Sequence, residues 1–345
     1  HILDINKVEM DKIFIVAELS ANHNHDYDLT VKTIKAMAEA GADAVKFQTY
    51  KPESLTLRAD TPYFGPKDSG LWKGMTLYEI YTQGSLPYEW QPKLKKLAND
   101  LGMMCFSTPF DREGVDFMEE MNMPIYKIAS AEINDVNLIE YVARKHKPMV
   151  LSTGMATLED VELAVKTCRK AGNDDITLLK CTSEYPAPVE KANLSSMLDL
   201  KERFGVKVGI SDHSMSNIIP IISVALGATM IEKHFIIDRS LGGIDSGFSL
   251  NKDEFASMVR DVRLAEKAMG EVEYMTDEET RLRKRSLFVV KDMEAGEIIT
   301  EDCVRSVRPG YGMAPKCLKE ILGKRVKCPQ KAGMPLLYDD LDWNA

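Results

Sequence analysis

Short apolar segments alternate with amphipathic helical segments eight times between residues 13 and 270. Each apolar segment is only about four to seven residues long and favours a strand, whereas the segments between them show the 3.6-residue apolar period of a helix. Regular alternation of this kind produces parallel strands that are connected by helices. Eight such units predict an α/β fold of the (β/α)₈ TIM-barrel type.

The expected elements have clear boundaries in the sequence. We expect strands at 13–19, 44–49, 103–107, 125–129, 149–152, 176–181, 207–210 and 230–234, and helices at 29–40, 89–101, 113–121, 137–145, 158–170, 194–204, 217–226 and 252–269. A long insert at 51–86, rich in Pro, Gly and aromatic residues, is predicted to cover a site. An open doubly wound sheet is the structural alternative, and it is disfavoured because no Gly-x-Gly-x-x-Gly turn follows any strand.

The pattern changes after Gly270. Residues 271–285 are strongly charged and are predicted to form a linker, and 286–345 are expected to contain short strands at 287–290, 298–300 and 304–307. We therefore divide the chain into a catalytic barrel at 1–270, a linker at 271–285 and a small domain at 286–345. About 60 residues make a marginal domain, so we expect this domain to pack on a barrel, either its own or a partner's.

The net charge of −9 argues against a general surface for nucleic acid or anionic membranes. An anionic ligand must therefore be held by cations placed locally. Six scattered cysteines without a C-x-x-C pair are typical of reduced thiols in the cytoplasm. The start of the chain shows no signal-peptide pattern, and the longest apolar run is too short for a bilayer. We expect a cytoplasmic protein with neither a nucleic-acid partner nor a membrane partner.

Polar residues end every expected strand. These clusters are Glu18 to His23, Lys46 to Gln48, Ser107-Thr108, Lys127 to Glu132, Ser152 to Gly154, Lys180 to Tyr185, Ser211 to His213 and Glu232 to His234. One polar strand end is unremarkable, but eight at the same end of a barrel coincide with the place where such folds carry their chemistry. This pattern predicts an enzyme.

His213 and His234 end the last two expected strands. Neutral imidazole is the commonest protein ligand for a catalytic divalent metal, which makes the pair a candidate metal site. The alternative is two unrelated histidines. Lys46 and Lys127 stand on apolar strands, where they either reach the barrel rim or hold a small dianion. The serines that end strands could cap helices, and helix N-termini also favour anions.

Several of these segments together resemble one family. They are Ala17-Glu-Leu-Ser-Ala-Asn-His23, Lys46-Phe-Gln-Thr-Tyr50, Phe106-Ser-Thr-Pro-Phe110, Tyr126-Lys-Ile-Ala-Ser130, Leu151-Ser-Thr-Gly-Met155, Lys180-Cys-Thr-Ser-Glu-Tyr-Pro186, Ser211-Asp-His213 and Glu232-Lys-His-Phe235. The chain resembles the sialic acid synthases from Ala17 to about Leu341, most closely the pseudaminic acid branch. Its tail, with Ser306-Val-Arg-Pro-Gly310, resembles the small antifreeze-like (SAF) domain of these enzymes.

The resemblance implies condensation of phosphoenolpyruvate with an N-acetylated amino sugar, in a domain-swapped homodimer. It implies that His213 and His234 hold Mn²⁺, with Mg²⁺ or Co²⁺ as alternatives. It assigns phosphoenolpyruvate to Lys46, Lys127, Ser130, Ser152, Ser183 and Ser211, and the sugar or water side to Glu18, Gln48, Thr108, Tyr185 and Asp245. It implies that Glu132 and Glu232 serve as acid–base or positioning groups and that Arg308 contacts the sugar's acyl group.

One departure bears on the substrate. General sialic acid synthases read closer to Glu-x-Gly-x-Asn-His-Asn-Gly where this chain has Glu18-Leu-Ser-Ala-Asn-His-Asn-His25, and Ser183 stands where many have Asn. With Trp72 in the insert, this implies a 2,4-diacetamido-2,4,6-trideoxy-altrose, with N-acetylneuraminate or legionaminate synthesis as alternatives. Two rivals stay open: a Schiff-base aldolase using Lys127 or Lys180, and a sugar-binding protein on a barrel without activity.

Overall fold

The computed structural model describes residues 12–344. The start of the chain, on which the expectation about a signal peptide rests, lies outside these residues. The chain forms two compact units, one up to Gly270 and the other from Glu271 onward. In the described part of the chain, no helix is both long and apolar enough to cross a membrane.

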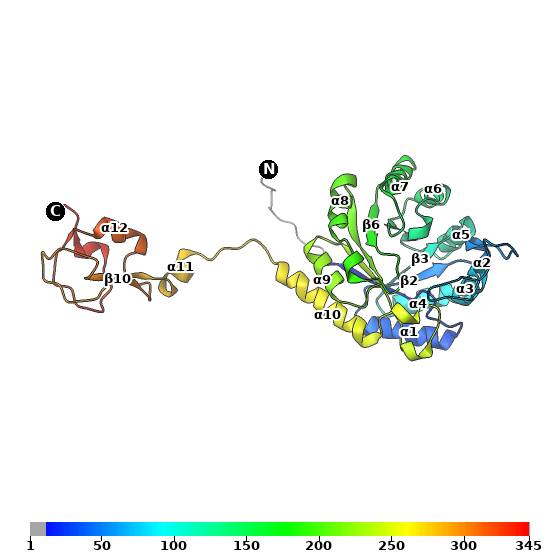
Figure 1. Ribbon diagram of the computed structural model, residues 1–345, viewed down its shortest axis with the longest axis horizontal. Helices are drawn as coiled ribbons and strands as arrows, with labels where there is room; N and C mark the ends of the chain where they lie inside the picture. Colours follow the sequence, from blue (N-terminus) through cyan, green and yellow to red (C-terminus); the bar gives the residue numbers. More distant parts are fainter. Residues whose placement is uncertain (1–11, 345) are drawn as a thin grey trace. The chain divides into compact units, whose positions relative to one another are not determined.

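The first unit is a closed barrel of eight parallel strands surrounded by helices (Figure 1). The strands are β1 (Phe14–Glu18), β2 (Ala44–Thr49), β3 (Met104–Pro109), β4 (Tyr126–Ile128), β5 (Met149–Ser152), β6 (Ile176–Cys181), β7 (Lys207–Asp212) and β8 (Met230–His234). Each strand pairs with its sequence neighbour, and β8 closes the ring on β1 with Glu18 opposite His234. The predicted (β/α)₈ barrel is confirmed.

Helices cover the outside of this barrel. They are α1 (Tyr27–Glu39), α4 (Gln91–Asp100), α5 (Arg112–Glu120), α6 (Val136–Ala143), α7 (Leu158–Lys170), α8 (Ser195–Phe204), α9 (Ile218–Ala225) and α10 (Lys252–Met269). Their apolar faces pack on the outward side chains of the strands and form the main core. Polar side chains begin most of them; for example, Asp26 accepts a hydrogen bond from the backbone of Leu29 at the start of α1.

The inside of the barrel is built in two layers. The lower layer is a small apolar cluster of Val16, Ala44, Phe106, Val150, Leu179 and Met230. Side chains two positions further along a strand point to the same side, and there the chain has Glu18, Lys46, Thr108, Ser152, Cys181 and Glu232. Gly209 completes the lower layer, because a Cβ there would lie 2.2 Å from the carbonyl oxygen of Met230. The apolar layer therefore forms a floor beneath a polar one.

The insert between β2 and the helices before β3 is partly helical. It contains α2 (Pro52–Leu55) and α3 (Leu77–Gly84). The start of α3 is a capping box, in which Thr76 and Glu79 bond each other's backbone N–H groups. Thr76-Leu-Tyr-Glu79 is a recognisable signal in the sequence, so this helix could have been predicted.

The second unit has its own apolar core, which includes Leu287, Val304, Ile321 and Leu341. Its elements are α11 (Asp277–Thr280), β9 (Ser286–Val289), β10 (Val304–Val307), α12 (Leu318–Ile321), β11 (Arg325–Val326) and β12 (Leu341–Asp342). The strand expected at 298–300 is wrong, because only Ile298 forms a bridge, to Arg325, and one bridge makes no strand. The charged segment expected as a linker contains α11.

Candidate active site

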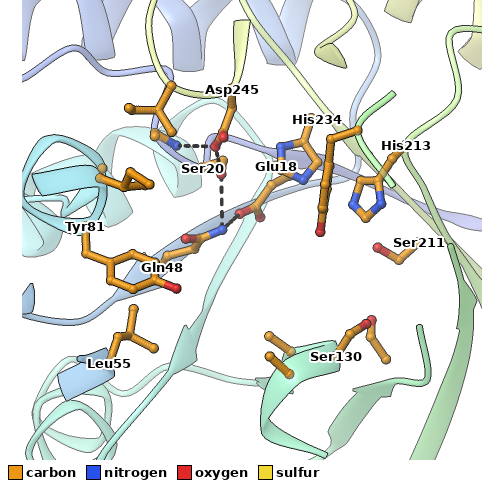
Figure 2. Close-up of a pocket in the computed structure, with 18 of the residues that line it drawn as sticks. Glu18, Ser20, Gln48, Leu55, Tyr81, Ser130, Ser211, His213, His234 and Asp245 are labelled. Atoms are coloured by element: carbon orange, nitrogen blue, oxygen red, sulfur yellow. Dashed lines mark hydrogen bonds between the residues drawn. The ribbon is translucent and has the colours of Figure 1, made fainter. Parts of the chain in front are cut away.

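A pocket of about 320 Å³ opens where the barrel strands end. All but three of the predicted site residues line it, namely Glu18, Lys46, Gln48, Lys127, Ser130, Glu132, Ser152, Tyr185, Ser211, His213, Glu232, His234 and Asp245. Figure 2 shows ten of the lining residues by name, converging from separate strands and loops. Residues spread over more than 220 sequence positions therefore share one cavity of a size that suits small-molecule substrates.

The three remaining predicted residues lie elsewhere. Thr108 is buried beside the pocket and accepts a hydrogen bond from Lys46 at 3.0 Å, so it orients that lysine. Ser183 is not among the lining residues, but it lies next to Gly154, where an added Cβ would come within 2.3 Å of the Ser183 hydroxyl. Arg308 belongs to the second unit, follows β10 and is exposed. Its role in the site stays a prediction.

Two lysines and two glutamates form a buried charge cluster at the floor of the pocket. Lys46 Nζ lies 2.7 Å from Glu18 Oε2 and 3.9 Å from Glu232 Oε1, and Lys127 Nζ lies 3.8 Å from Glu232 Oε2. All four side chains are at most 4% exposed. Buried charges are costly unless they are paired. The long distances to Glu232 leave both ammonium groups able to take a further anionic partner.

The carboxylic acids of the pocket differ in their pKa values. Burial raises the pKa of Glu18 to about 7, although Lys46 beside it acts in the opposite direction. Burial also raises the pKa of Glu132 to about 7. Burial acts in the same direction on Glu232, but Lys127 and Lys46 outweigh it and hold the pKa of that carboxyl low. Glu18 and Glu132 can therefore exchange protons near neutral pH, whereas Glu232 stays ionised.

Several polar atoms of this pocket have no partner. Among the described residues, the buried atoms Ser152 Oγ, Glu132 Oε2, Glu232 Oε2 and His234 Nδ1 form no hydrogen bond. Buried polar atoms in proteins are nearly always bonded. Such exceptions, gathered in one cavity, indicate that the pocket is built to bind a polar ligand.

The two histidines lie side by side at the rim of the pocket, with ring centroids 5.1 Å apart (Figure 2). His213 Nδ1 donates to the carbonyl oxygen of Thr182 at 2.9 Å, which leaves Nε2 as the free lone-pair nitrogen. Burial holds the pKa of His234 well below its usual value and keeps its ring neutral. Phe248 packs against His234 at 4.9 Å between centroids and fixes its orientation.

These features fit a divalent metal. The neutral ring of His234 offers a lone pair, and its unpartnered Nδ1 is the kind of atom that a metal would satisfy. Burial acts to lower the pKa of His213, but contacts with Cys181 and Thr182 outweigh it and raise that pKa, so a metal bound through its Nε2 would displace a proton. Within the described residues, no group of three or more His, Cys, Asp or Glu side chains is arranged to hold a metal ion, so the two histidines have no third protein ligand of these types. The pair would therefore leave coordination positions for water or substrate, as catalytic metal sites require.

The insert forms an apolar wall of the pocket. Leu55, Leu77, Ile80 and Tyr81 line the cavity from α2, α3 and their surroundings. Trp72 also lines the pocket, and its indole N–H donates to the carbonyl oxygen of Ile244 at 3.0 Å. This bond ties the insert to the loop that carries Asp245. The insert covers the site, as predicted.

Other lining residues were missed in the sequence. They are Ser20, Tyr50, Tyr81, Cys181 and Phe248, together with Lys67 of the insert. Ser20 and Cys181 belong to the polar strand ends already identified, so the period of two could have indicated them. Phe248 follows β8 in a loop without any periodic pattern, and only the folded chain places it beside the histidines.

The eight-stranded barrel, with paired lysines, carboxyls of shifted pKa and two histidines at the strand ends, defines a TIM-barrel enzyme for a small anionic substrate. The chain belongs to the NeuB family, whose model matches residues 33–274, and a SAF-domain model matches residues 284–342. The family predicted from the sequence motifs is confirmed.

Relatives support this assignment along nearly the whole chain. A pseudaminic acid synthase of Campylobacter jejuni is 45% identical over 95% of this chain and 96% of its own length. An N,N'-diacetyllegionaminic acid synthase of Legionella pneumophila is 36% identical, covering 95% of this chain and 94% of its own length. Among solved structures, the N-acetylneuraminic acid synthetase of Leptospira borgpetersenii superposes with a TM-score of 0.70 at 31% identity, over 79% of this chain and 91% of that one.

Proposed function

We propose that this chain is a pseudaminic acid synthase, which condenses phosphoenolpyruvate with 2,4-diacetamido-2,4,6-trideoxy-β-L-altrose and water. The products are pseudaminic acid and phosphate. The observation that carries the proposal is a cavity in which two buried lysines and several unpartnered polar atoms face one another. The identity to a pseudaminic acid synthase, 45% against 36% for a legionaminic acid synthase, favours this branch of the family.

Phosphoenolpyruvate is assigned to the serine and lysine side of the pocket. Lys46 and Lys127 neutralise its carboxylate and phosphate, and the unpartnered hydroxyl of Ser152 donates to a phosphate oxygen. Ser130 and Ser211 add further donors, and the hydroxyl of Ser183 lies next to Gly154 close to that of Ser130. Because the protein is acidic overall, these local cations are what allows an anionic substrate to bind.

A divalent metal ion, Mn²⁺ in our proposal, would be held by His213 and His234 and would supply Lewis-acid polarisation of the sugar aldehyde. Around it, Gln48, Tyr185 and Asp245 hold the open-chain sugar with its aldehyde facing the phosphoenolpyruvate. The ring of Tyr185 packs against His213 at 4.5 Å between centroids, which joins the sugar side to the histidines.

The reaction requires several proton movements. C3 of phosphoenolpyruvate forms a bond to the aldehyde carbon, and the aldehyde oxygen becomes a hydroxyl by taking one proton. Water adds to C2 and gives up one proton, which balances the proton taken by the aldehyde oxygen. The C2–oxygen bond to phosphate then breaks, the second proton of that water passes to the leaving phosphate, and C2 becomes a ketone. Glu18 and Glu132, with pKa values of about 7, can each carry these protons. Ionised Glu232 keeps both lysines in place.

The apolar wall suits a deoxy sugar. A methyl group at C6 and the methyl ends of two acetamido groups gain from contact with Leu55, Leu77 and Ile80. A sugar that carries hydroxyls at these positions would leave them without partners against the wall, and unpaired polar groups are costly.

The substrate proposal predicts a clear order in a phosphate-release assay. The altrose-configured diacetamido sugar should have a kcat/KM at least about 100-fold above that of N-acetylmannosamine, because the wall penalises hydroxyls. The measurement uses purified protein, phosphoenolpyruvate and Mn²⁺ with each sugar in turn, and a legionaminate-type diacetamido sugar as the near relative. Equal or better turnover of N-acetylmannosamine would return the chain to the general sialic acid branch.

We further propose that the second unit of each subunit completes the site of the other in a two-fold dimer. Arg308 is exposed and forms no ion pair with any residue in the described range. Its guanidinium has the donor geometry to bind an acyl carbonyl of the sugar. The turn that carries it is fixed by Ser286, whose hydroxyl donates to the carbonyl oxygen of Pro309 at 2.7 Å.

Mixing one inactive variant with one impaired variant tests this arrangement. His213→Ala disables a barrel and Arg308→Ala impairs a tail, so a mixed dimer contains one whole site and one with both defects. Random re-pairing makes about half of the dimers mixed, which leaves roughly a quarter of all sites whole. Activity should rise well above the sum of the separate variants. If mixed dimers form and no activity returns, the tail acts on its own barrel.

A further inference from the structure

Ser20 adopts an unusual backbone conformation at the edge of the pocket. Its φ is +47°, in the left-handed region that glycine occupies without strain and other residues rarely adopt. The residue is 4% exposed and lies two positions after Glu18. A strained backbone conformation persists only when surrounding contacts hold the residue in it. The contacts of the Ser20 side chain are therefore informative.

The hydroxyl of Ser20 joins two parts of the pocket (Figure 2). It donates to Asp245 Oδ2, and it accepts a hydrogen bond from Gln48 Nε2 at 3.1 Å. The same amide nitrogen of Gln48 donates to Glu18 Oε1 at 2.8 Å. Asp245, Ser20, Gln48 and Glu18 therefore form one continuous chain of hydrogen bonds.

The members of this chain come from three separate segments. Glu18 ends β1, Gln48 lies on β2, and Asp245 belongs to the loop after β8. The backbone N–H of Ala21 also donates to Asp245 Oδ2, at 3.2 Å. Trp72 holds the neighbouring carbonyl oxygen of Ile244 from the insert. The Asp245 loop is thus attached to the end of β1 on one side and to the insert on the other.

We propose that Ser20 is a positioning residue for the sugar half of the reaction. Its hydroxyl fixes the Asp245 carboxylate and turns the Gln48 amide so that both face the sugar, and the left-handed backbone is what brings the hydroxyl there. This inference rests on the proposed function, since it assigns Asp245 and Gln48 to the sugar. Phosphoenolpyruvate, bound to the lysines and serines, should not depend on Ser20.

Two substitutions separate the hydroxyl from the backbone. Ser20→Ala removes the hydroxyl and keeps the strain, whereas Ser20→Gly removes the hydroxyl and relieves the strain. We expect both to lower kcat/KM for the sugar by about 10- to 100-fold, the effect of losing a hydrogen bond to a charged group. KM for phosphoenolpyruvate should change less than about threefold in both. The Gly variant should melt about 1–3 °C above the Ala variant.

The matched control is Asn122→Gly. Asn122 has a φ of +52° and is exposed between α5 and β4, so this change should leave turnover unaltered and Tm equal or higher. If Ser20→Gly retains the activity of the unaltered protein while Ser20→Ala loses it, backbone strain alone explains the residue and the positioning role is overturned.

A readout without turnover separates this inference from the proposed function. In a crystal structure of Ser20→Ala, the Asp245 carboxylate and the Gln48 amide should rotate away from their present positions. Unmoved side chains would overturn the inference, whatever the enzyme turns over. Absence of phosphate release by the unaltered protein with every diacetamido sugar would instead overturn the proposed function.

Discussion

Replacing His213 or His234 with Ala is expected to lower turnover by on the order of 10³-fold or more, because polarisation of the aldehyde contributes several kcal/mol to the reaction. Exhaustive chelation of the unaltered protein should have the same effect, and adding Mn²⁺ should restore activity. The measurements are phosphate release and elemental analysis of protein-bound metal after dialysis. Bound metal should fall in both variants, because each loses one of two imidazole ligands.

His146→Ala is the control for this experiment. His146 lies outside the pocket, between α6 and β5, so its loss should change neither the metal content nor the rate. Circular dichroism should show that all three variants keep the barrel. Full activity after chelation, with no metal found in the protein, would remove the metal from the mechanism and leave the two histidines as polar rim residues.

Replacing Lys46 or Lys127 with Met should lower kcat/KM for phosphoenolpyruvate by about 100-fold or more. Removing one partner of a buried charge pair costs about 2–5 kcal/mol. In these variants the lost partner is the buried lysine that pairs with the anionic substrate. The sugar KM should change much less. Steady-state kinetics with each substrate varied in turn distinguishes the two effects, and an unchanged phosphoenolpyruvate dependence would leave these residues as structural lysines.

Lys180→Met is the matched control. Lys180 also stands near a strand end, but it is half-buried, lies outside the pocket lining and donates to the carbonyl oxygen of Cys181 at 2.9 Å. Its loss should leave the kinetics nearly unchanged. The lysine variants also test the Schiff-base alternative. If a lysine forms a Schiff base, borohydride with substrate should modify and inactivate the unaltered enzyme, and only the variant that lacks the nucleophilic lysine should escape this modification.

The two variants should differ in stability. Lys46 lies 2.7 Å from Glu18, so its loss leaves that buried carboxyl without a cation and Glu18 responds by staying protonated. Lys127 is 3.8 Å from Glu232, which retains Lys46 and the hydroxyl of Ser211 as partners. Both substitutions act on one cluster, so their effects on activity should not add.

The strand period was sufficient to identify most of the site. Alternation of side chains sends every second residue inward, so Glu18, Lys46, Ser152, Ser211 and Glu232 were all predictable as members of one polar layer. The same rule explains Thr108, which shares the layer but lies behind Lys46. Ser183 was less predictable, because it stands beyond the end of β6 and the loop geometry decides its direction.

Other features depended on contacts between distant segments. The sequence showed an insert rich in Pro, Gly and aromatic residues, but only the fold placed Leu55, Leu77 and Trp72 against the pocket and joined Trp72 to Ile244. Serine does not prefer the left-handed backbone of Ser20, so the residue itself does not predict it, although general sialic acid synthases have Gly at this position of the motif. The strand expected at 298–300 is wrong because only Ile298 forms a bridge, and its partner Arg325 lies in a segment distant in the sequence.

Local patterns were enough to predict the barrel, the family and the residue types at the strand ends, because strand and helix periods, turns and motifs are local properties of the chain. Tertiary structure decided which of those residues meet. The unequal pKa values of Glu18 and Glu232 arise from burial and from their distances to two lysines, and no local pattern contains them. The hydrogen-bond chain from Asp245 to Glu18 likewise exists only because the closed barrel brings β1, β2 and the loop after β8 together.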